Sequence, residues 1–275
     1  MNKFIINNLI RESIQNDEAN IFGKIGSVEA KHLSHYVKTQ KAEVLTGNTL
    51  FVNAGIHCEN KDSLKSWCDS YINSISNTDY ILSWCGFAGD QYIIDKYWNN
   101  KATFWTFAGL EPFDLNDQDN PWHKHLSGKT MLWIGPLADT ARQQSENYSL
   151  LWNCDAPEIK VVKSPYQECL TDSQDYCDWQ HKFKQMCDQI DKVGHFDFAV
   201  LGVGGFSLLL CNYIKQKGKT AIHLGGGNNL ILGINTKRGR GAYLKKPWFG
   251  AEHWVSPMSH EIPIKKNLVE GGCYW

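Results

Sequence analysis

The chain has 275 residues, with 28 Lys and Arg against 29 Asp and Glu, and a formal net charge of −1 at pH 7. This length suits one large α/β domain or two small ones. The balanced charge and the pI of about 6.8 exclude a broadly basic surface for nucleic acid, and no apolar run approaches the roughly 20 residues of a membrane helix.

Cysteine usage and the N-terminus indicate the cytoplasm. Nine cysteines are scattered without a Cys-x-x-Cys pair, which is typical of reduced thiols rather than a disulfide framework. No Cys or His spacing resembles a zinc site. The pairs His32 with His35 and His123 with His125 are interpreted as surface residues. The first residues turn polar too early for a secretory signal, so we expect a cytoplasmic protein.

Apolar periodicity predicts alternating helices and strands along the first part of the chain. The predicted helices are residues 4–16, 27–38, 61–76 and 91–98, and the predicted strands are 20–24, 49–54, 80–84 and 102–107. A turn-rich loop at 110–125 follows. It is a candidate boundary between an N-terminal half, 1–115, and a C-terminal half, 116–275.

The same alternation continues after this loop. The predicted strands are 129–134, 159–162, 197–203 and 220–224, and the predicted helices are 139–151, 172–191 and one that ends at Gly218. From Asn235 the pattern gives way to glycine, aromatic and basic residues. Such alternation predicts a single α/β domain over 1–275, with a Rossmann-like, doubly wound, mostly parallel sheet and helices on both faces.

Two glycine-rich turns follow neighbouring predicted strands, GVGG at 202–205 and GGG at 225–227. A right-handed crossover would bring both turns to the carboxyl edge of the sheet, where open α/β folds bind ligands. We expect their backbone N–H groups to bind anionic oxygens of a nucleotide diphosphate or a sugar. The candidate donors are Gly204, Gly205, Gly225 and Gly226. The alternative is that these glycines only permit tight turns and close packing.

A nicotinamide dinucleotide is disfavoured by this pattern. Its fingerprint requires G-x-G-x-x-G and an acidic residue some 20 positions later. Here the second strand ends in His223 and glycine, without a carboxylate.

A second motif, KIGSVE at 24–29, lies where a predicted strand passes into a helix. Gly26 provides the turn and Ser27 is the expected N-cap, so Glu29 lies in the first helical turn. Glu29 either complements the helix dipole or serves a site. A capping box does not explain it, because it is one position short of that motif.

A short basic cluster follows the second glycine turn. Its members are Lys237, Arg238, Arg240, Lys245 and Lys246. A solvated loop is the favoured interpretation, and anionic groups on a small ligand are the competing one.

KIGSVE resembles the R-x-G-[DS]-x-E signature near the N-terminus of GT-D-type glycosyltransferases and related bacterial polysaccharide-biosynthesis proteins. The resemblance continues through most of the chain, at Asn53-Ala54-Gly55-Ile56, Asn120-Pro121-Trp122, Gly135-Pro136-Leu137, residues 197–233, Glu270 and Tyr274-Trp275.

This resemblance implies a Rossmann-like hexosyl- or pentosyltransferase that moves a sugar from a nucleotide-sugar donor to a hydroxyl of a glycan acceptor. In the family pattern an Asp-x-Glu pair serves the donor diphosphate through a divalent metal, Mn or Mg. Glu29 is retained as the catalytic and metal-binding candidate, while Ser27 replaces the Asp and Lys24 replaces the Arg. A hydroxyl is a weaker ligand than a carboxylate for a hard cation, but Lys24 still offers a point charge to phosphate.

Transfer to a hydroxyl requires a base within hydrogen-bonding reach. His223, at the end of its strand, and Asp90, after the CGFAG loop, are the candidates. For His223 the alternative is a hydrogen-bonded residue that lines the sheet. Two other classes stay open: a nucleotide- or sugar-binding protein without turnover, and another nucleotide-dependent enzyme such as a methyltransferase or dehydrogenase. The missing acidic residue after the second strand disfavours the last class.

Overall fold

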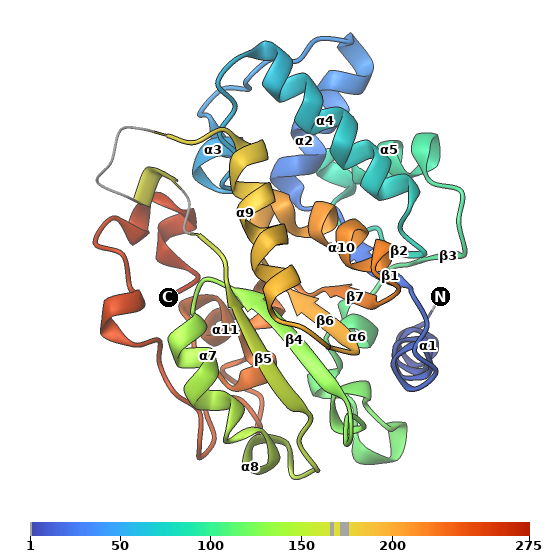
Figure 1. Ribbon diagram of the computed structural model, residues 1–275, viewed down its shortest axis with the longest axis vertical. Coiled ribbons are helices and arrows are strands. Elements are labelled where there is room, and N and C mark those ends of the chain that lie inside the picture. Colours follow the sequence, from blue (N-terminus) through green and yellow to red (C-terminus); the bar gives the residue numbers. More distant parts are fainter. Residues whose placement is uncertain (1, 166–167, 171–175) are drawn as a thin grey trace.

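A parallel sheet forms the centre of the computed structural model, which describes residues 2–165, 168–170 and 176–275. Its strands are β1 (Ile21–Lys24), β2 (Tyr80–Leu82), β3 (Ala102–Phe104), β4 (Thr130–Gly135), β5 (Glu158–Lys163), β6 (Phe198–Leu201) and β7 (Thr220–His223). The seven strands have the order β3-β2-β1-β7-β6-β4-β5, and every neighbouring pair is parallel (Figure 1). This confirms the predicted Rossmann-like, doubly wound fold.

Helices cover both faces of the sheet, because its strands are apolar on both sides. Along β4, Leu132 and Ile134 belong to one hydrophobic core, and Met131 and Trp133 belong to the other. The helices of the first core are α2 (Ser27–Thr39), α3 (Thr49–Val52), α4 (Lys61–Ser76), α5 (Asp90–Tyr97), α9 (Trp179–Lys192) and α10 (Ser207–Gln216). Those of the second are α1 (Lys3–Gln15), α6 (Phe107–Leu110), α7 (Ala138–Ser145), α8 (Tyr148–Trp152) and α11 (Lys237–Tyr243).

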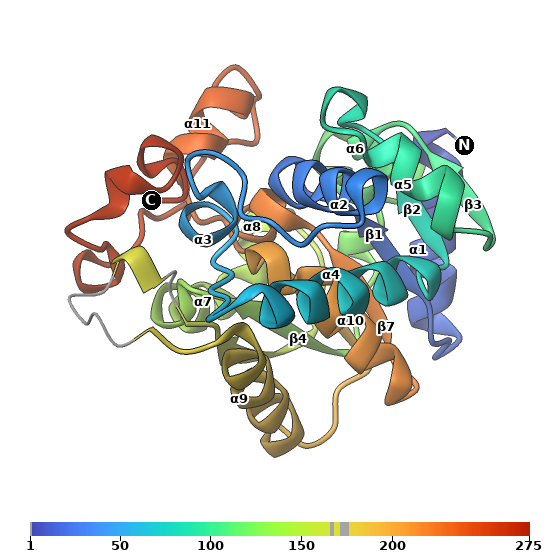
Figure 2. The ribbon, with the colours of Figure 1, turned by 90° about the horizontal axis from the view of Figure 1, so that it is seen from above.

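The chain changes face between neighbouring strands. The loops after β1 and β6 lead to α2 and α10 on the first face, whereas the loops after β4 and β7 lead to α7 and α11 on the second. Figure 2 shows α4, α9 and α10 together on one side of the sheet and α11 on the opposite side. Loops that diverge in this way open a crevice at the carboxyl edge of a parallel sheet.

Strands from both predicted halves of the chain lie in this one sheet. Phe22 in β1 pairs with Tyr80 of β2 on one side and with Ile222 of β7 on the other. The loop at 110–125 packs against α1, where the backbone N–H of Trp122 donates to Oδ1 of Asn7 at 2.8 Å.

Several local predictions were wrong. Residues 49–54 are not a strand, because Thr49–Val52 forms a helical turn that buries Leu50 in the first core. The predicted helix 139–151 is divided into α7 and α8 around Asn147, whose side-chain amide donates to Oε1 of Gln144.

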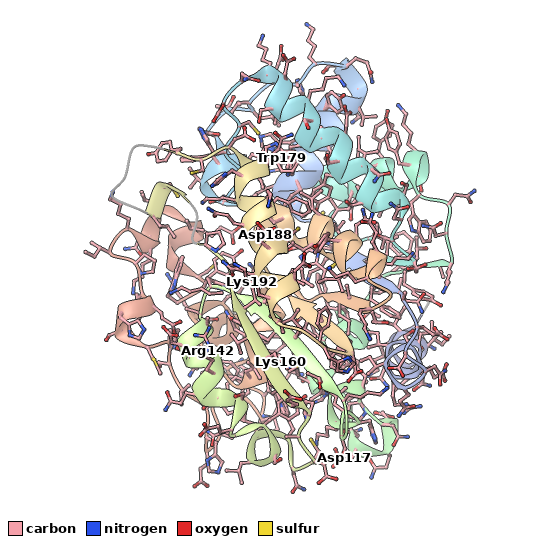
Figure 3. All side chains as sticks on the ribbon, in the orientation of Figure 1. Asp117, Arg142, Lys160, Trp179, Asp188 and Lys192 are labelled. Atoms are coloured by element: carbon pink, nitrogen blue, oxygen red, sulfur yellow. The ribbon has the colours of Figure 1, made fainter. Side chains whose placement is uncertain are left out.

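The helix predicted over 172–191 begins only at Trp179, where the side chain of Asp178 accepts the N–H of Gln180. Residues 172–175 of that prediction lie outside the described residues. Figure 3 shows Trp179 and Lys192 at the two ends of α9. None of the described helices is long and apolar enough to cross a bilayer.

Two histidines interpreted as surface residues are buried. His32 is 3 % exposed on the inner side of α2, and its Nδ1 lies 2.9 Å from the carbonyl oxygen of Val28. His123 is 1 % exposed and packs between aromatic rings. Neither position is distinguishable from a surface histidine by sequence spacing alone.

Candidate functional site

A cavity of about 430 Å³ lies at the carboxyl edge of the sheet, where the loops after β1, β4, β6 and β7 diverge. Its volume is in the range of small-molecule sites, and its position is the one expected for a doubly wound sheet. Eight of the ten predicted site residues line it: Lys24, Gly26, Ser27, Glu29, Gly204, His223, Gly225 and Gly226.

The other two predicted residues, Asp90 and Gly205, do not line this cavity. Oδ2 of Asp90 accepts the backbone N–H groups of Trp84 at 2.8 Å and Cys85 at 2.9 Å, which closes the loop between β2 and α5. The N–H of Gly205 donates to the carbonyl oxygen of Ala54 at 2.9 Å. Both groups therefore stabilise loops. The Asp90 carboxylate is not positioned as a base, and the Gly205 N–H is not positioned to donate a hydrogen bond to a phosphate.

Charged side chains lie across the second glycine turn. A Cβ on Gly225 would be 3.0 Å from Cε of Lys24, and one on Gly226 would be 2.9 Å from Cδ of Arg238. The next residue, Gly227, faces the carboxyl group of Glu111 in the same way. The absence of side chains on this turn is thus what admits three charged side chains to the cavity.

The first glycine turn packs against backbone. Gly204 has φ of +55°, and a Cβ there would lie 2.5 Å from the carbonyl oxygen of Ala54. Glycine is required here both for its conformation and for this close approach. The glycines of both turns are therefore needed for close packing, which was the alternative interpretation of these turns.

Lys24 is a buried cation at the end of β1, only 7 % exposed. Its Nζ donates to the carbonyl oxygen of Leu224 at 2.8 Å, lies 3.3 Å from Oε1 of Glu111 and is 4.6 Å from the centre of the Phe107 ring. Burial lowers the pKa of Lys24, and the ion pair with Glu111 opposes that effect. The hydroxyl of Tyr243 donates to the other oxygen of Glu111 at 3.1 Å.

Glu29 lies in the first turn of α2, and its carboxyl group folds back over Gly26. It is 6 % exposed. Burial and the negative charge of Glu270 together raise the pKa of Glu29 to about 7. A helix-dipole role alone would leave this carboxylate in water, so its burial beside a cavity favours a role in the site.

His223 is held by the backbone at the end of β7. Its Nδ1 lies 3.0 Å from the carbonyl oxygen of Lys24, which can only accept, so Nδ1 carries the proton and Nε2 is the acceptor. Burial and the charge of Lys24 lower the pKa of His223 to about 3. The ring is therefore neutral at physiological pH, which agrees with the alternative of a hydrogen-bonded residue lining the sheet and makes it a weak base.

Several residues that line the cavity were not predicted as site residues: Trp84, Phe107, Glu111, Arg238, Tyr243 and Glu270. Arg238 carried a signal as part of the basic cluster after the second glycine turn. Glu111 carried none, because it lies 87 residues from its partner Lys24 in a turn-rich loop.

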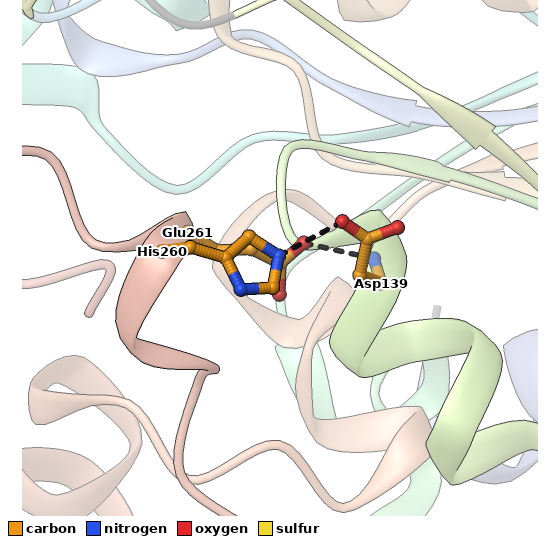
Figure 4. Close-up of side chains that lie close together, drawn as sticks. All are labelled: Asp139, His260 and Glu261. Carbon is orange, nitrogen blue, oxygen red and sulfur yellow. Dashed lines mark hydrogen bonds and ion pairs between the residues drawn. The ribbon is translucent and has the colours of Figure 1, made fainter.

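A separate cluster of possible metal ligands comprises Asp139, His260 and Glu261, none of which lines the cavity (Figure 4). Its oxygens are already engaged. Glu261 accepts the N–H groups of Asp139 at 2.8 Å and Thr140 at 3.0 Å. Asp139 pairs with Arg142 at 2.6 Å and His260 at 3.0 Å. This arrangement caps α7 rather than surrounding a cation.

No protein-family model matches the chain, and neither a curated protein nor a solved structure does. The resemblance to GT-D-type glycosyltransferases therefore stays a prediction from motifs.

Proposed function

We propose that the cavity binds a nucleotide-sugar donor and that the protein is a glycosyltransferase acting on a hydroxyl of a glycan. The observation that carries this proposal is that Lys24, both glycine turns and the buried Glu29 line one cavity. This cavity lies at the carboxyl edge of the sheet, where loops from neighbouring strands lead to opposite faces. Open α/β sheets bind phosphorylated ligands at this place.

Lys24 matches the charge demand of the transfer. The nucleotide diphosphate leaves with negative charge, which a desolvated cation stabilises more strongly than one in water. The ammonium group has three donors, of which Leu224 and Glu111 engage two. Among the described residues the third donor has no hydrogen-bond partner, so it can bind a diphosphate oxygen.

A divalent cation fits this donor set only together with the substrate. Glu29, Glu111 and Glu270 line the cavity, and Glu111 is paired with Lys24, so two carboxylates are left to bind a cation among the described residues. Mg²⁺ and Mn²⁺ are commonly held by one or two carboxylates and completed by phosphate oxygens. Such a cation would neutralise charge on the leaving diphosphate.

The apolar part of the cavity suits a sugar or base ring. Trp84 and Phe107 both line it and meet edge to face, with ring centres 5.4 Å apart. Aromatic faces pack on the apolar faces of rings. In this arrangement Nε2 of His223 can accept a hydrogen bond from a ligand hydroxyl and orient it.

The test is a panel of UDP-, GDP-, CMP- and dTDP-sugars with glycan acceptors, with and without Mn²⁺, measured as nucleotide release. We expect one nucleotide class to turn over. Lys24→Gln and Glu29→Gln should each lower kcat/KM by about 100-fold, equivalent to about 2.7 kcal/mol. Lys31 and Glu43 are exposed and do not line the cavity, so Lys31→Gln and Glu43→Gln are the control variants and should change kcat/KM less than twofold.

Absence of turnover with every donor would contradict the glycosyltransferase. Donor binding without turnover would instead support the second candidate, a nucleotide- or sugar-binding protein. That candidate is favoured by Ser27, which stands where the family pattern has a carboxylate, and by the low pKa of His223.

A further inference from the structure

Arg238 is the one member of the basic cluster that lines the cavity, and the proposed function leaves it unused. It lies at the start of α11, which is tied to the chain around 271–275. Its own backbone N–H donates to the carbonyl oxygen of Cys273 at 2.7 Å, and that of Lys237 donates to Trp275 at 3.0 Å. The position of its side chain is therefore set by two segments rather than by one mobile loop.

The guanidinium group is also held from two sides. Its Cζ lies 5.3 Å from the centre of the Tyr274 ring, and Nη1 donates to the Tyr274 hydroxyl at 2.8 Å. Nη1 is also 3.4 Å from Oε2 of Glu270, which is a long and single contact for an Arg–carboxylate pair.

Among the described residues the rest of the guanidinium group has no hydrogen-bond partner, and the Arg238 side chain is 45 % exposed. Over residues 2–165, 168–170 and 176–275, hydrogen bonds from the Arg238 side chain start only at Nη1. Nε and Nη2 form the planar edge that binds both oxygens of a phosphate or carboxylate. An oriented arginine with that edge unfilled, in a cavity, has the donor pattern of an anion subsite.

A second cation faces the same turn. The side chain of Arg238 lies over Gly226, and the side chain of Lys24 lies over the adjacent Gly225. The two are near enough for the charge of Arg238 to lower the pKa of Lys24. An anionic ligand between them relieves this repulsion, and neighbouring residues of one turn suit neighbouring oxyanions.

We propose that Arg238, held over Gly226 by Tyr274 and Glu270, is an oxyanion subsite that receives a phosphate or carboxylate group of the ligand through its Nε–Nη2 edge. This inference rests on the proposed function only in taking the cavity as a ligand site. Glu270 contacts only Nη1, outside that edge, and its negative charge repels an anionic ligand.

The experiment is isothermal titration of the full chain with three probes: inorganic pyrophosphate, uridine diphosphate and glucuronate. We expect Arg238→Gln to weaken binding of at least one probe about tenfold or more, since a charge-assisted bidentate contact is lost. Glu270→Gln should tighten the same probe about threefold, because the repelling negative charge is removed while the amide oxygen can still accept from Nη1. Arg240→Gln, on the same helix but outside the cavity, is the matched control and should bind as the unchanged protein does.

The probes distinguish the source of the oxyanion. A loss confined to pyrophosphate and uridine diphosphate assigns the subsite to a diphosphate, and a loss confined to glucuronate assigns it to the carboxylate of a charged sugar. Unchanged binding of every probe by Arg238→Gln, or no binding at millimolar concentration by the unchanged protein, would overturn the proposal. If Arg238→Gln fails to fold, Arg238→Lys replaces it and should still bind at least about threefold more weakly, because the charge remains but the planar edge is lost.

Turnover is measured separately on the same variants. Probe binding that depends on Arg238 without turnover of any nucleotide sugar leaves the subsite standing and contradicts the glycosyltransferase. If a nucleotide sugar is turned over but Arg238→Gln binds every probe as the unchanged protein does, only the subsite proposal is contradicted.

Discussion

Gly202 and Gly225 meet backbone to backbone at the carboxyl ends of β6 and β7: a Cβ on Gly202 would occupy the space of the Gly225 carbonyl oxygen. The backbone N–H of Leu224 donates to the carbonyl oxygen of Leu201 at 2.9 Å and keeps the two turns in register. The two glycine turns are thus one packed unit, and the cavity lies against it.

Gly202→Ala should lower the free energy of unfolding by about 3 kcal/mol, because the obstructing atom is backbone and cannot rotate away. Urea unfolding measures this. Gly86→Ala is the matched control, since a Cβ there meets no atom within 4 Å, and it should change stability by less than about 0.5 kcal/mol. Equal midpoints for the two variants would show that the turns can separate without cost.

His123→Phe should stabilise the protein. His123 packs against Trp152 at 4.5 Å and Phe113 at 5.5 Å between ring centres, and within the described residues neither of its ring nitrogens has a hydrogen-bond partner. Removing two unpaired buried polar atoms should raise the free energy of unfolding by about 1 kcal/mol at pH 7.5.

This stabilisation should grow in acid. Burial lowers the pKa of His123 well below 6.5, so the ring of the folded protein becomes protonated at a lower pH than the ring of the unfolded chain. The contribution of the neutral ring is present above pH 6.5 and is lost as the pH falls, by up to about 1.4 kcal/mol per pH unit. Urea midpoints at pH 7.5 and 5.5 test this, with the exposed His181→Phe as control. A pH-independent gain for His123→Phe would contradict a buried neutral ring.

Glu29→Gln should stabilise the metal-free protein at alkaline pH. The pKa of Glu29 is raised from 4.5 to about 7, so its contribution is present below pH 4.5 and is lost as the pH rises through 7. The variant does not titrate, so its free energy of unfolding at pH 8 should exceed that of the unchanged protein by about 3 kcal/mol. At pH 4.5 the two should be nearly equal. Thermal unfolding in EDTA at both pH values decides this, and a constant difference would mean that Glu29 titrates as in water.

Glu261→Ala should destabilise α7. The buried carboxylate accepts from the backbone N–H groups of Asp139 and Thr140 and from the Thr140 hydroxyl. Their loss should cost about 2–3 kcal/mol in urea unfolding. His260→Ala, which removes only the exposed pair with Asp139, should cost less than about 1 kcal/mol. Similar losses for both variants would contradict this capping role.

Much of the fold could be predicted from local patterns. Residues 61–76 form the predicted helix because Asn60 caps its first turn and its apolar residues recur at helical spacing. Residues 49–54 mislead, since Thr-Leu-Phe-Val favours a strand by composition while packing in the first core makes it a helical turn. The strand propensity of these four residues is therefore outweighed by the burial of Leu50 in the first core.

The sequence by itself determined the parallel sheet and the carboxyl-edge position of the two glycine turns, whereas the pairing of β1 with β7, which brings Lys24 beside the second turn, came from the tertiary structure. The sheet and the position of the turns follow from short-range periodicity and from the handedness of crossovers. Only the tertiary structure decided which groups are already engaged, such as Asp90 in its loop and the N–H of Gly205 on Ala54. It alone brought Glu111 and Arg238 onto the glycine turn. The physical reason is that hydrogen bonds, burial and charge pairing depend on atoms far apart in the chain, which no local pattern records.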